Sequence, residues 1–148
     1  MSGSPTTVAK KRPEFRNINA FKDLPSYRLP VAGIVSILHR VSGAIMFILM
    51  PFIIWMFDTS VSSEISFNKF RSAFESGMLG VPGILWKLVV LALIWAYLHH
   101  AIAGVRHLWM DTSHAAVSKE FGKSSAIFTL AVSISLTVVL GAKLFGLY

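Results

Sequence analysis

Three long apolar segments constrain this chain more than any other feature of its sequence. They run from about Val31 to Phe57, from Ile84 to Met110 and from Ala126 to Tyr148. As a helix, each is long enough to cross a hydrocarbon core of about 30 Å, which takes about 20 residues. Their apolar character is continuous, and three segments are too few to close a barrel. The sequence therefore predicts an all-α membrane protein with three transmembrane helices.

The composition of the 148-residue chain agrees with this prediction. Hydrophobic residues make up 54% of it and charged residues only 14%, whereas a soluble domain carries about a quarter charged residues. The chain has no cysteine. It therefore cannot itself supply a disulfide, a thiolate zinc site or cysteine ligands for an iron–sulfur cluster.

The formal net charge of +7 lies mostly outside the apolar segments. Basic residues in such places set membrane topology or contact anionic lipid, so we expect membrane lipid and no nucleic acid as a partner. Residues 1–30 form a basic N-terminal segment, and residues 31–148 form the three-helix domain. The N-terminus is expected on the cytoplasmic side, because the dominant positive charge stays inside. We expect no secretory signal, and a short amphipathic helix over Ile65–Phe74 in the first connection.

With this topology, the start of the first span and the end of the second lie at the same face of the membrane. The first span begins with SILHRVSG, Ser36 to Gly43, and the second ends with LHHAIAGVRHLWMD, Leu98 to Asp111. Ionisable groups are costly at membrane depth and mark function by default. We therefore expect the two clusters to form one site in the inner leaflet.

Depth separates the histidines of the second span. At 1.5 Å per residue, His100 lies about 16 Å from Asp111, near the middle of the bilayer, and His107 about 6 Å from it. His100, Gly104 and His107 share one helix face. Gly104 leaves room there for a flat group or for a neighbouring helix. His99 is rotated away from that face by about 100°.

Haem suits this arrangement, because its iron takes a histidine nitrogen and its propionates need cations near the water interface. His100 is the candidate metal ligand. The candidates to meet propionates are His39, Arg40, Arg106 and His107. A quinone pocket fits part of the pattern, because Ser36 and Arg40 lie one turn apart and both donate hydrogen bonds. The alternative is that the histidines bond only to neighbouring helices. His114, beyond the second span, is expected to be a loop residue.

These residues resemble the cytochrome b556 membrane-anchor family of succinate dehydrogenase, respiratory complex II. The similar features are KRPEF near the start, RLPVAGIVSILHRVSG leading into the first span, and H-x3-G-V-R-H-L-x2-D closing the second. The resemblance covers the chain from about Lys11 to the C-terminus and includes all three spans in the expected order.

The resemblance implies that His100 is the axial ligand of haem b and that Ser36 and Arg40 belong to a ubiquinone site. It also implies that three further basic residues lie near the haem propionates: His39, Arg106 and His107. His99 directly precedes His100, and relatives can carry an aromatic residue at its position. The spacing to Gly104 favours His100 as the ligand, while His99 has no firm role.

The resemblance further implies that the chain is not a catalyst alone but a subunit of a succinate:quinone oxidoreductase of the tricarboxylic acid cycle. Its expected partners are a second membrane-anchor subunit that shares the haem, an iron–sulfur subunit and a flavoprotein. The expected location is the inner membrane of a bacterium rather than of a mitochondrion. Two alternatives stay open, a quinol:fumarate reductase anchor and a non-redox membrane subunit for assembly or transport.

Overall fold

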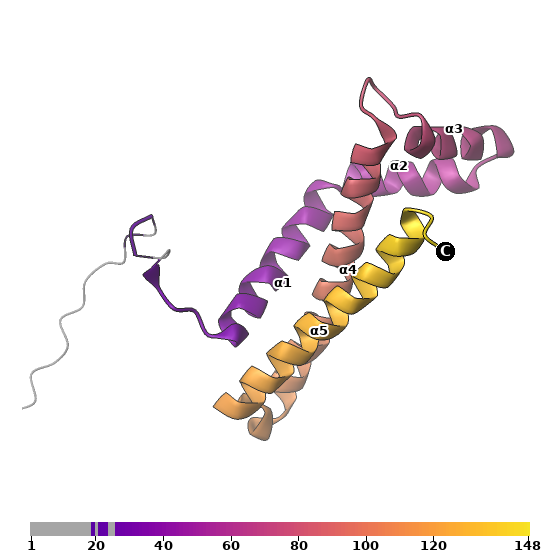
Figure 1. Cartoon of the computed structure of the whole chain (residues 1–148). Helices are drawn as coiled ribbons and strands as arrows, with labels where there is room; N and C mark the ends of the chain where they lie inside the picture. The colour runs from indigo at the N-terminus through magenta and orange to yellow at the C-terminus, as the bar shows by residue number, and fades with distance from the viewer. Residues whose placement is uncertain (1–18, 20, 24–25) are drawn as a thin grey trace, which may run out of the picture.

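The described residues of the computed structural model, 19, 21–23 and 26–148, form helices and no strand (Figure 1). In chain order the helices are α1 (Val31–Ile48), α2 (Met50–Val61), α3 (Glu64–Glu75), α4 (Gly83–Thr112), the short 3-10 helix η2 (His114–Val117) and α5 (Lys119–Leu144). Three of them, α1, α4 and α5, are long and apolar enough to cross a membrane. The predicted all-α fold with three spans is confirmed.

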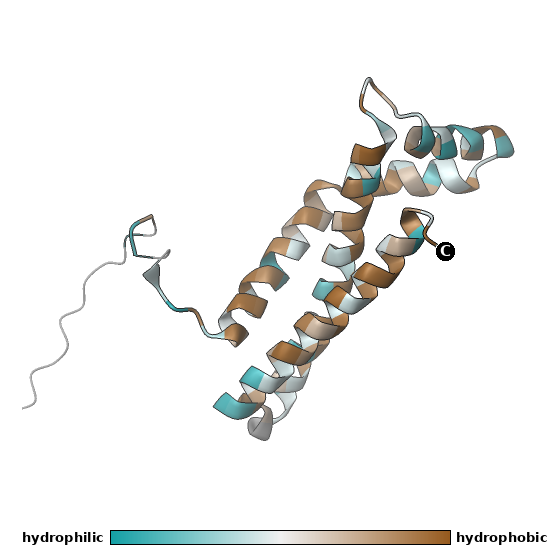
Figure 2. Cartoon of the chain, viewed as in Figure 1, coloured by the Kyte–Doolittle hydropathy of each residue, from teal (hydrophilic) through white to brown (hydrophobic). Residues whose placement is uncertain are grey.

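The three long helices pack lengthwise into a bundle in which α4 contacts both α1 and α5 (Figure 1). Val35 of α1, Ala103 of α4 and Ala126 of α5 have no exposed surface and form the centre of the bundle. Lipid tails are as apolar as leucine, so small residues that allow close approach hold membrane helices together. The larger apolar side chains are mostly exposed on the outside of the bundle, and the ribbons of the long helices are largely brown, the colour of hydrophobic residues, in Figure 2.

The first apolar segment is broken rather than continuous. We expected one helix from Val31 to Phe57, but α1 ends at Ile48 and α2 begins at Met50. Pro51 in the first turn of α2 explains the break, because its ring lacks an N–H and clashes with the carbonyl four residues earlier. Beyond it, α2 turns away from the axis of α1 (Figure 1). The 18 residues of α1 span about 27 Å, enough to cross most of the hydrocarbon core alone.

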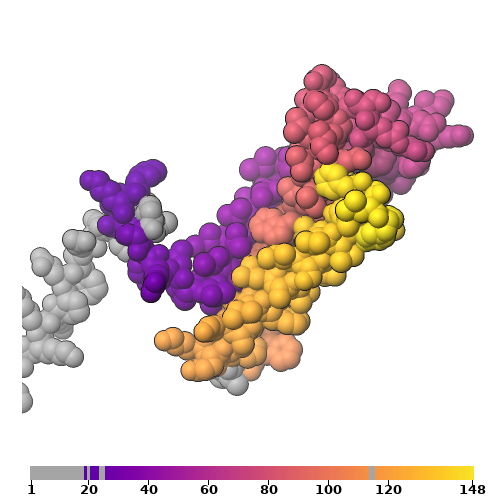
Figure 3. Space-filling model, in the orientation of Figure 1, coloured from indigo at the N-terminus to yellow at the C-terminus, as the bar shows by residue number. Residues whose placement is uncertain are grey.

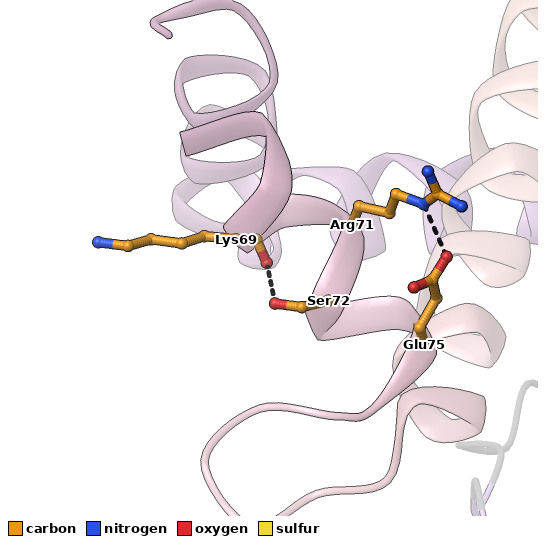
Figure 4. Close-up of polar contacts among 4 residues, drawn as sticks. All are labelled: Lys69, Arg71, Ser72 and Glu75. Carbon is orange, nitrogen blue, oxygen red and sulfur yellow. Dashed lines mark hydrogen bonds and ion pairs between the residues drawn. The ribbon is translucent and has the colours of Figure 1, made fainter. Parts of the chain in front are cut away.

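Helices α2 and α3 pack on each other beside the start of α4 (Figure 1). The amphipathic helix expected over Ile65–Phe74 is confirmed as α3. On its exposed face, Arg71 Nε donates to Glu75 Oε1 at 2.7 Å, and Ser72 Oγ donates to the Lys69 carbonyl at 2.9 Å (Figure 4). Exposed ion pairs contribute little to stability, so the packing of α3 on α2 and α4 holds it in place.

The second span agrees with the sequence closely, and the third begins earlier than expected. Helix α5 starts at Lys119 rather than near Ala126, because Ser118 caps it: its Oγ accepts a hydrogen bond from the Phe121 N–H at 3.3 Å. Such a cap satisfies one of the free N–H groups of the first turn. The early start brings α5 to the end of the bundle where α1 also begins, so that the two starts lie side by side in Figure 3.

Replacing Ala126 with leucine is predicted to destabilise the bundle. Ala126 has no exposed surface, and adding carbon atoms to a well-packed site typically costs about 1–3 kcal/mol. Ala131→Leu is the matched control, because Ala131 is exposed on the same helix. The measurement is the midpoint of thermal unfolding of the purified protein in detergent. Equal midpoints for the two variants would contradict the packing described above.

Candidate functional site

Three imidazoles meet where α1 packs on α4. The rings of His39 and His100 are stacked, with centroids 4.1 Å apart and 19° between their planes. The His39 and His107 centroids lie 5.1 Å apart. His39 of α1 therefore contacts both histidines on the shared face of α4. The polar residues of the first span and of the end of the second span are therefore in contact, as we expected from their position at one membrane face.

A carbonyl group of α1 holds the His100 ring. Nδ1 of His100 lies 3.0 Å from the His39 carbonyl oxygen and 3.3 Å from Ser42 Oγ. Ser42 Oγ donates to that same carbonyl at 2.8 Å. A carbonyl oxygen only accepts hydrogen bonds, so Nδ1 carries the ring proton. Nε2 then keeps its lone pair, which is the form of imidazole that binds a metal.

Gly43 makes this position of the ring possible. A Cβ atom at residue 43 would lie 3.0 Å from His100 Cε1 and 3.3 Å from its Nδ1. Those distances are shorter than ordinary contacts, so a side chain there would push the imidazole away from α1. Gly104 is less restrictive, since a Cβ there would meet His39 Nε2 at an ordinary 3.6 Å. We expected Gly104 to leave room either for a flat group or for a neighbouring helix. In the structure the neighbouring helix α1 takes this room, with the side chain of His39.

His99 points to the other side of α4 and is fully buried. Its Nδ1 lies 3.3 Å from Ser133 Oγ of α5, and its ring stacks on Trp95 with centroids 5.4 Å apart. Its Nε2 has no hydrogen-bond partner among the described residues. A group as large as a porphyrin reaches this nitrogen only if the packed helices of the bundle separate.

Arg106 is also directed at α5 and not at the imidazoles. It is only 8% exposed, its Nε donates to Ser125 Oγ at 2.9 Å, and its Nη2 donates to the Gly122 carbonyl at 3.2 Å. His107, the next residue, is rotated from it by about 100° around the helix. The structure therefore separates Arg106 from the histidines with which the sequence grouped it. Its contact with a haem propionate stays a prediction.

Ser36 and Arg40 occupy α1, one turn apart, at the end of the bundle where α1 begins. Ser36 is half-buried and Arg40 is exposed. Within the part of the chain that the structure describes, the only ion pair joins Arg71 and Glu75. The guanidinium of Arg40 therefore has no carboxylate partner there and is available to a ligand.

The histidines do not form a multi-ligand metal site. Within residues 19, 21–23 and 26–148, no group of three His, Asp or Glu side chains is arranged to hold a metal ion. The imidazoles of the α1–α4 contact stack on one another, so this face offers single nitrogens rather than a cage. His114, expected in a loop, belongs to η2 by its backbone, and its side chain lies outside the described part.

The sequence reasoning missed two serines that the structure shows as histidine partners. Ser42 lies in the quoted motif, but nothing in its spacing indicates that it contacts His100 on another helix. Ser133 lies 34 positions from His99, and only the packing of α5 on α4 brings the two together. The one signal in the sequence was the presence of hydroxyl residues, such as Ser133, within the apolar α5, because buried hydroxyls usually bind a polar partner.

Replacing Ser133 with alanine is predicted to destabilise the α4–α5 contact, because the buried Nδ1 of His99 then loses its hydroxyl partner. A buried polar group without a partner costs about 1–3 kcal/mol. The control is Ser135→Ala, since Ser135 is exposed on the same helix. The free energy of unfolding, measured by titration with SDS in mixed micelles, should fall only for Ser133→Ala. An equal fall for both variants would show that the His99 contact adds nothing.

Comparisons with known proteins agree on one family. Residues 10–140 match the family described as succinate dehydrogenase/fumarate reductase transmembrane subunit. A relative from Coxiella burnetii, named succinate dehydrogenase cytochrome b556 subunit, is 32% identical over 120 residues, covering 80% of this chain and 90% of that protein. A relative of the same name from Paracoccus denitrificans is 30% identical over 116 residues, covering 78% of this chain and 83% of that protein.

Proposed function

The chain belongs to the succinate dehydrogenase/fumarate reductase transmembrane subunit family, and we propose that it binds haem b and forms part of a ubiquinone-reduction site. The resemblance drawn from its two polar motifs is thereby confirmed, and its three long apolar helices are those of a transmembrane subunit. The family description covers both directions of the succinate–fumarate reaction. Both relatives are named after succinate dehydrogenase, which favours succinate oxidation.

The hydrogen bond from His100 Nδ1 to the His39 carbonyl is the observation that carries this proposal. Histidines that bind a metal through one nitrogen usually hold the other N–H in a hydrogen bond, which fixes the tautomer and the ring orientation. His100 already has this bond within the chain. The relatives are cytochromes b556 by name, and a b-type haem takes such an imidazole.

His99 fits the role of iron ligand less well than His100. Its Nδ1 pairs with a serine hydroxyl of α5, and its Nε2 is enclosed in the packed interior of the bundle. Separating the helices to reach it would expose the buried Ser133 and the small residues of the bundle centre. We therefore assign the axial nitrogen to His100 Nε2. One anchor chain offers one such nitrogen, so a second membrane-anchor subunit supplies the other ligand.

Two further histidines of this chain suit the propionates. His39 stacks directly on His100, and His107 lies nearer the end of α4 and hence nearer the headgroups. Imidazole N–H groups and the guanidinium of Arg40 can donate hydrogen bonds to carboxylates at that depth. Haem b at this place would supply single-electron chemistry beside the quinone. His100 would hold its iron, and His39, His107 and Arg40 would bind its propionates.

Ser36 and Arg40 are the residues of this chain that we assign to the quinone site. Ser36 donates a hydrogen bond to a quinone oxygen. Arg40, one turn further along α1 and without a carboxylate partner among the described residues, stabilises the negative charge that grows on an oxygen of the reduced quinone. It also orients the water that delivers a proton. Electrons reach the quinone from the iron–sulfur subunit, which receives them from the flavoprotein that oxidises succinate.

The bacterial inner membrane is the proposed location, with the N-terminus in the cytoplasm. Both relatives come from bacteria. The positive charge of residues 1–30 favours retention of that segment on the cytoplasmic side. The quinone site then faces the same side as the soluble subunits that deliver its electrons.

Replacing His100 with alanine is predicted to remove the low-spin b-type α band from the optical spectrum of the purified complex and to shift its Soret band. The physical reason is the loss of one axial nitrogen. His99→Gln is the matched control, since it changes the neighbouring imidazole but leaves the nitrogen of His100 in place. Unchanged bands in His100→Ala, or loss of the α band only in the His99 variant, would refute the assignment.

Ser36→Ala and Arg40→Ala are each predicted to lower the rate of quinone reduction about tenfold or more, because a hydrogen bond to a charged group is worth about 1.5–3 kcal/mol. Succinate oxidation with a soluble dye should continue at the normal rate, since the flavoprotein is untouched. Ile37→Ala, at an exposed position of the same helix turn, is the control. Normal quinone kinetics in both variants would contradict the proposed site.

A further inference from the structure

We propose that the groove between the starts of α1 and α5 binds the headgroup of an anionic phospholipid. The groove has a volume of about 800 Å³ and lies at the end of the bundle where these two helices begin (Figure 3). Arg106 of α4 borders it together with Lys119 and Lys123 of α5. His100 and His107 lie on a different face of α4 and do not border this groove.

Arg106 supplies hydrogen-bond donors that the chain itself leaves unused. A guanidinium has five N–H groups, and the bonds to Ser125 and Gly122 occupy one on Nε and one on Nη2. Among the described residues, the only fully enclosed polar side-chain atom without a partner is His99 Nε2. Arg106 Nη1, which is not among such atoms, therefore keeps exposed surface, and Arg106 borders the groove. A buried cation with unused donors favours a nearby anion.

The two lysines add charge at the rim of the groove. Lys119 and Lys123 are exposed and lie one turn apart on one side of α5, and the N-terminal end of this helix adds a partial positive charge. Glu120 also borders the groove. Within the described ranges, however, the only ion pair is the distant one between Arg71 and Glu75. Three cations and one carboxylate border the groove, so its described lining carries an excess of positive charge.

The depth and the apolar lining of the groove indicate a lipid rather than a soluble anion. Arg106 lies six residues before the end of α4 at Thr112, which is about 9 Å along the helix axis and places it near headgroup level. Leu29, Val31 and Met110 line the groove beside the cations. A phospholipid matches this pairing, because its phosphate meets the cations and the first carbons of its chains meet the apolar lining.

A second cavity on Arg106 fits the same ligand class. It has a volume of about 450 Å³, lies between α4 and α5, and is lined almost wholly by apolar side chains such as Val105, Trp109 and Phe128. Its shape and lining suit an acyl chain. A zwitterionic headgroup brings its own cation toward Lys119 and Lys123, which disfavours it. The ligand is therefore an anionic phospholipid such as phosphatidylglycerol, attracted by basic residues at the membrane surface.

The test uses the complete complex, delipidated in detergent and titrated with phosphatidylglycerol or with phosphatidylcholine of the same acyl chains. Bound lipid is counted by native mass spectrometry, and thermal stability is followed in parallel. We expect saturable binding and a raised unfolding midpoint with phosphatidylglycerol only. The double variant Lys119→Gln/Lys123→Gln should bind it about tenfold or more weakly. Lys143→Gln, at the opposite end of α5, should bind it normally.

Three results would overturn the proposal. The first is equal binding of the two lipids, and the second is normal phosphatidylglycerol binding by the double lysine variant. The third is equal protection by soluble glycerol phosphate, which would indicate a phosphate site without a lipid. None of these readouts requires haem or quinone, so they test this site independently of the proposed function.

Discussion

The contact between α1 and α4 is the interaction on which the site depends. A helix inside a bilayer must satisfy its polar groups within the protein, because lipid offers no hydrogen bonds. His100 does so by donating a hydrogen bond from its ring N–H to the backbone carbonyl of His39 in α1. Gly43 allows the approach, and Ser42 reinforces it. This hydrogen bond satisfies His100 Nδ1 and leaves Nε2 with a free lone pair. One helix contact therefore both packs the ring and prepares the nitrogen that we propose binds iron.

Helix α4 uses the same residue types for different purposes on its two sides. His100 and His107 face α1, where they meet His39. His99 and Arg106 face α5, where a serine and a backbone carbonyl bind them. Of the two adjacent histidines, His100 lies on the face that we propose binds the cofactor, and His99 lies in the helix interface. Polar residues that seem misplaced in an apolar segment are distributed by face as well as by depth.

Much of the fold could be predicted from the sequence, because hydropathy and helix length are strong local signals. They gave three spans, the amphipathic helix α3 and the meeting of two polar motifs at one membrane face. The break at Pro51 was visible as a residue, yet continuous apolarity hid it, since α2 is as apolar as the span before it. The early start of α5 depends on the Ser118 cap, a signal that the apolar pattern does not contain.

The candidate site was predicted less completely than the fold. The shared face of His100 and His107 followed from periodicity, because residues on one helix face stay together whatever else packs there. The nearness of His39 followed from the expected topology, which puts the start of α1 and the end of α4 at one membrane face. The direction of Arg106 did not follow, since it depends on where α5 lies around α4. The partner of His99 depended on the same unknown. Pairings between distant helices require the packing itself.

A cryo-EM structure of the purified complex, at a resolution that shows the haem, tests the central claim most directly. We predict that the iron is bonded to His100 Nε2 and that His100 Nδ1 stays within hydrogen-bond distance of the His39 carbonyl. His99 should remain between α4 and α5, beside Ser133. An iron bonded to His99, or to no histidine of this chain, would contradict the claim.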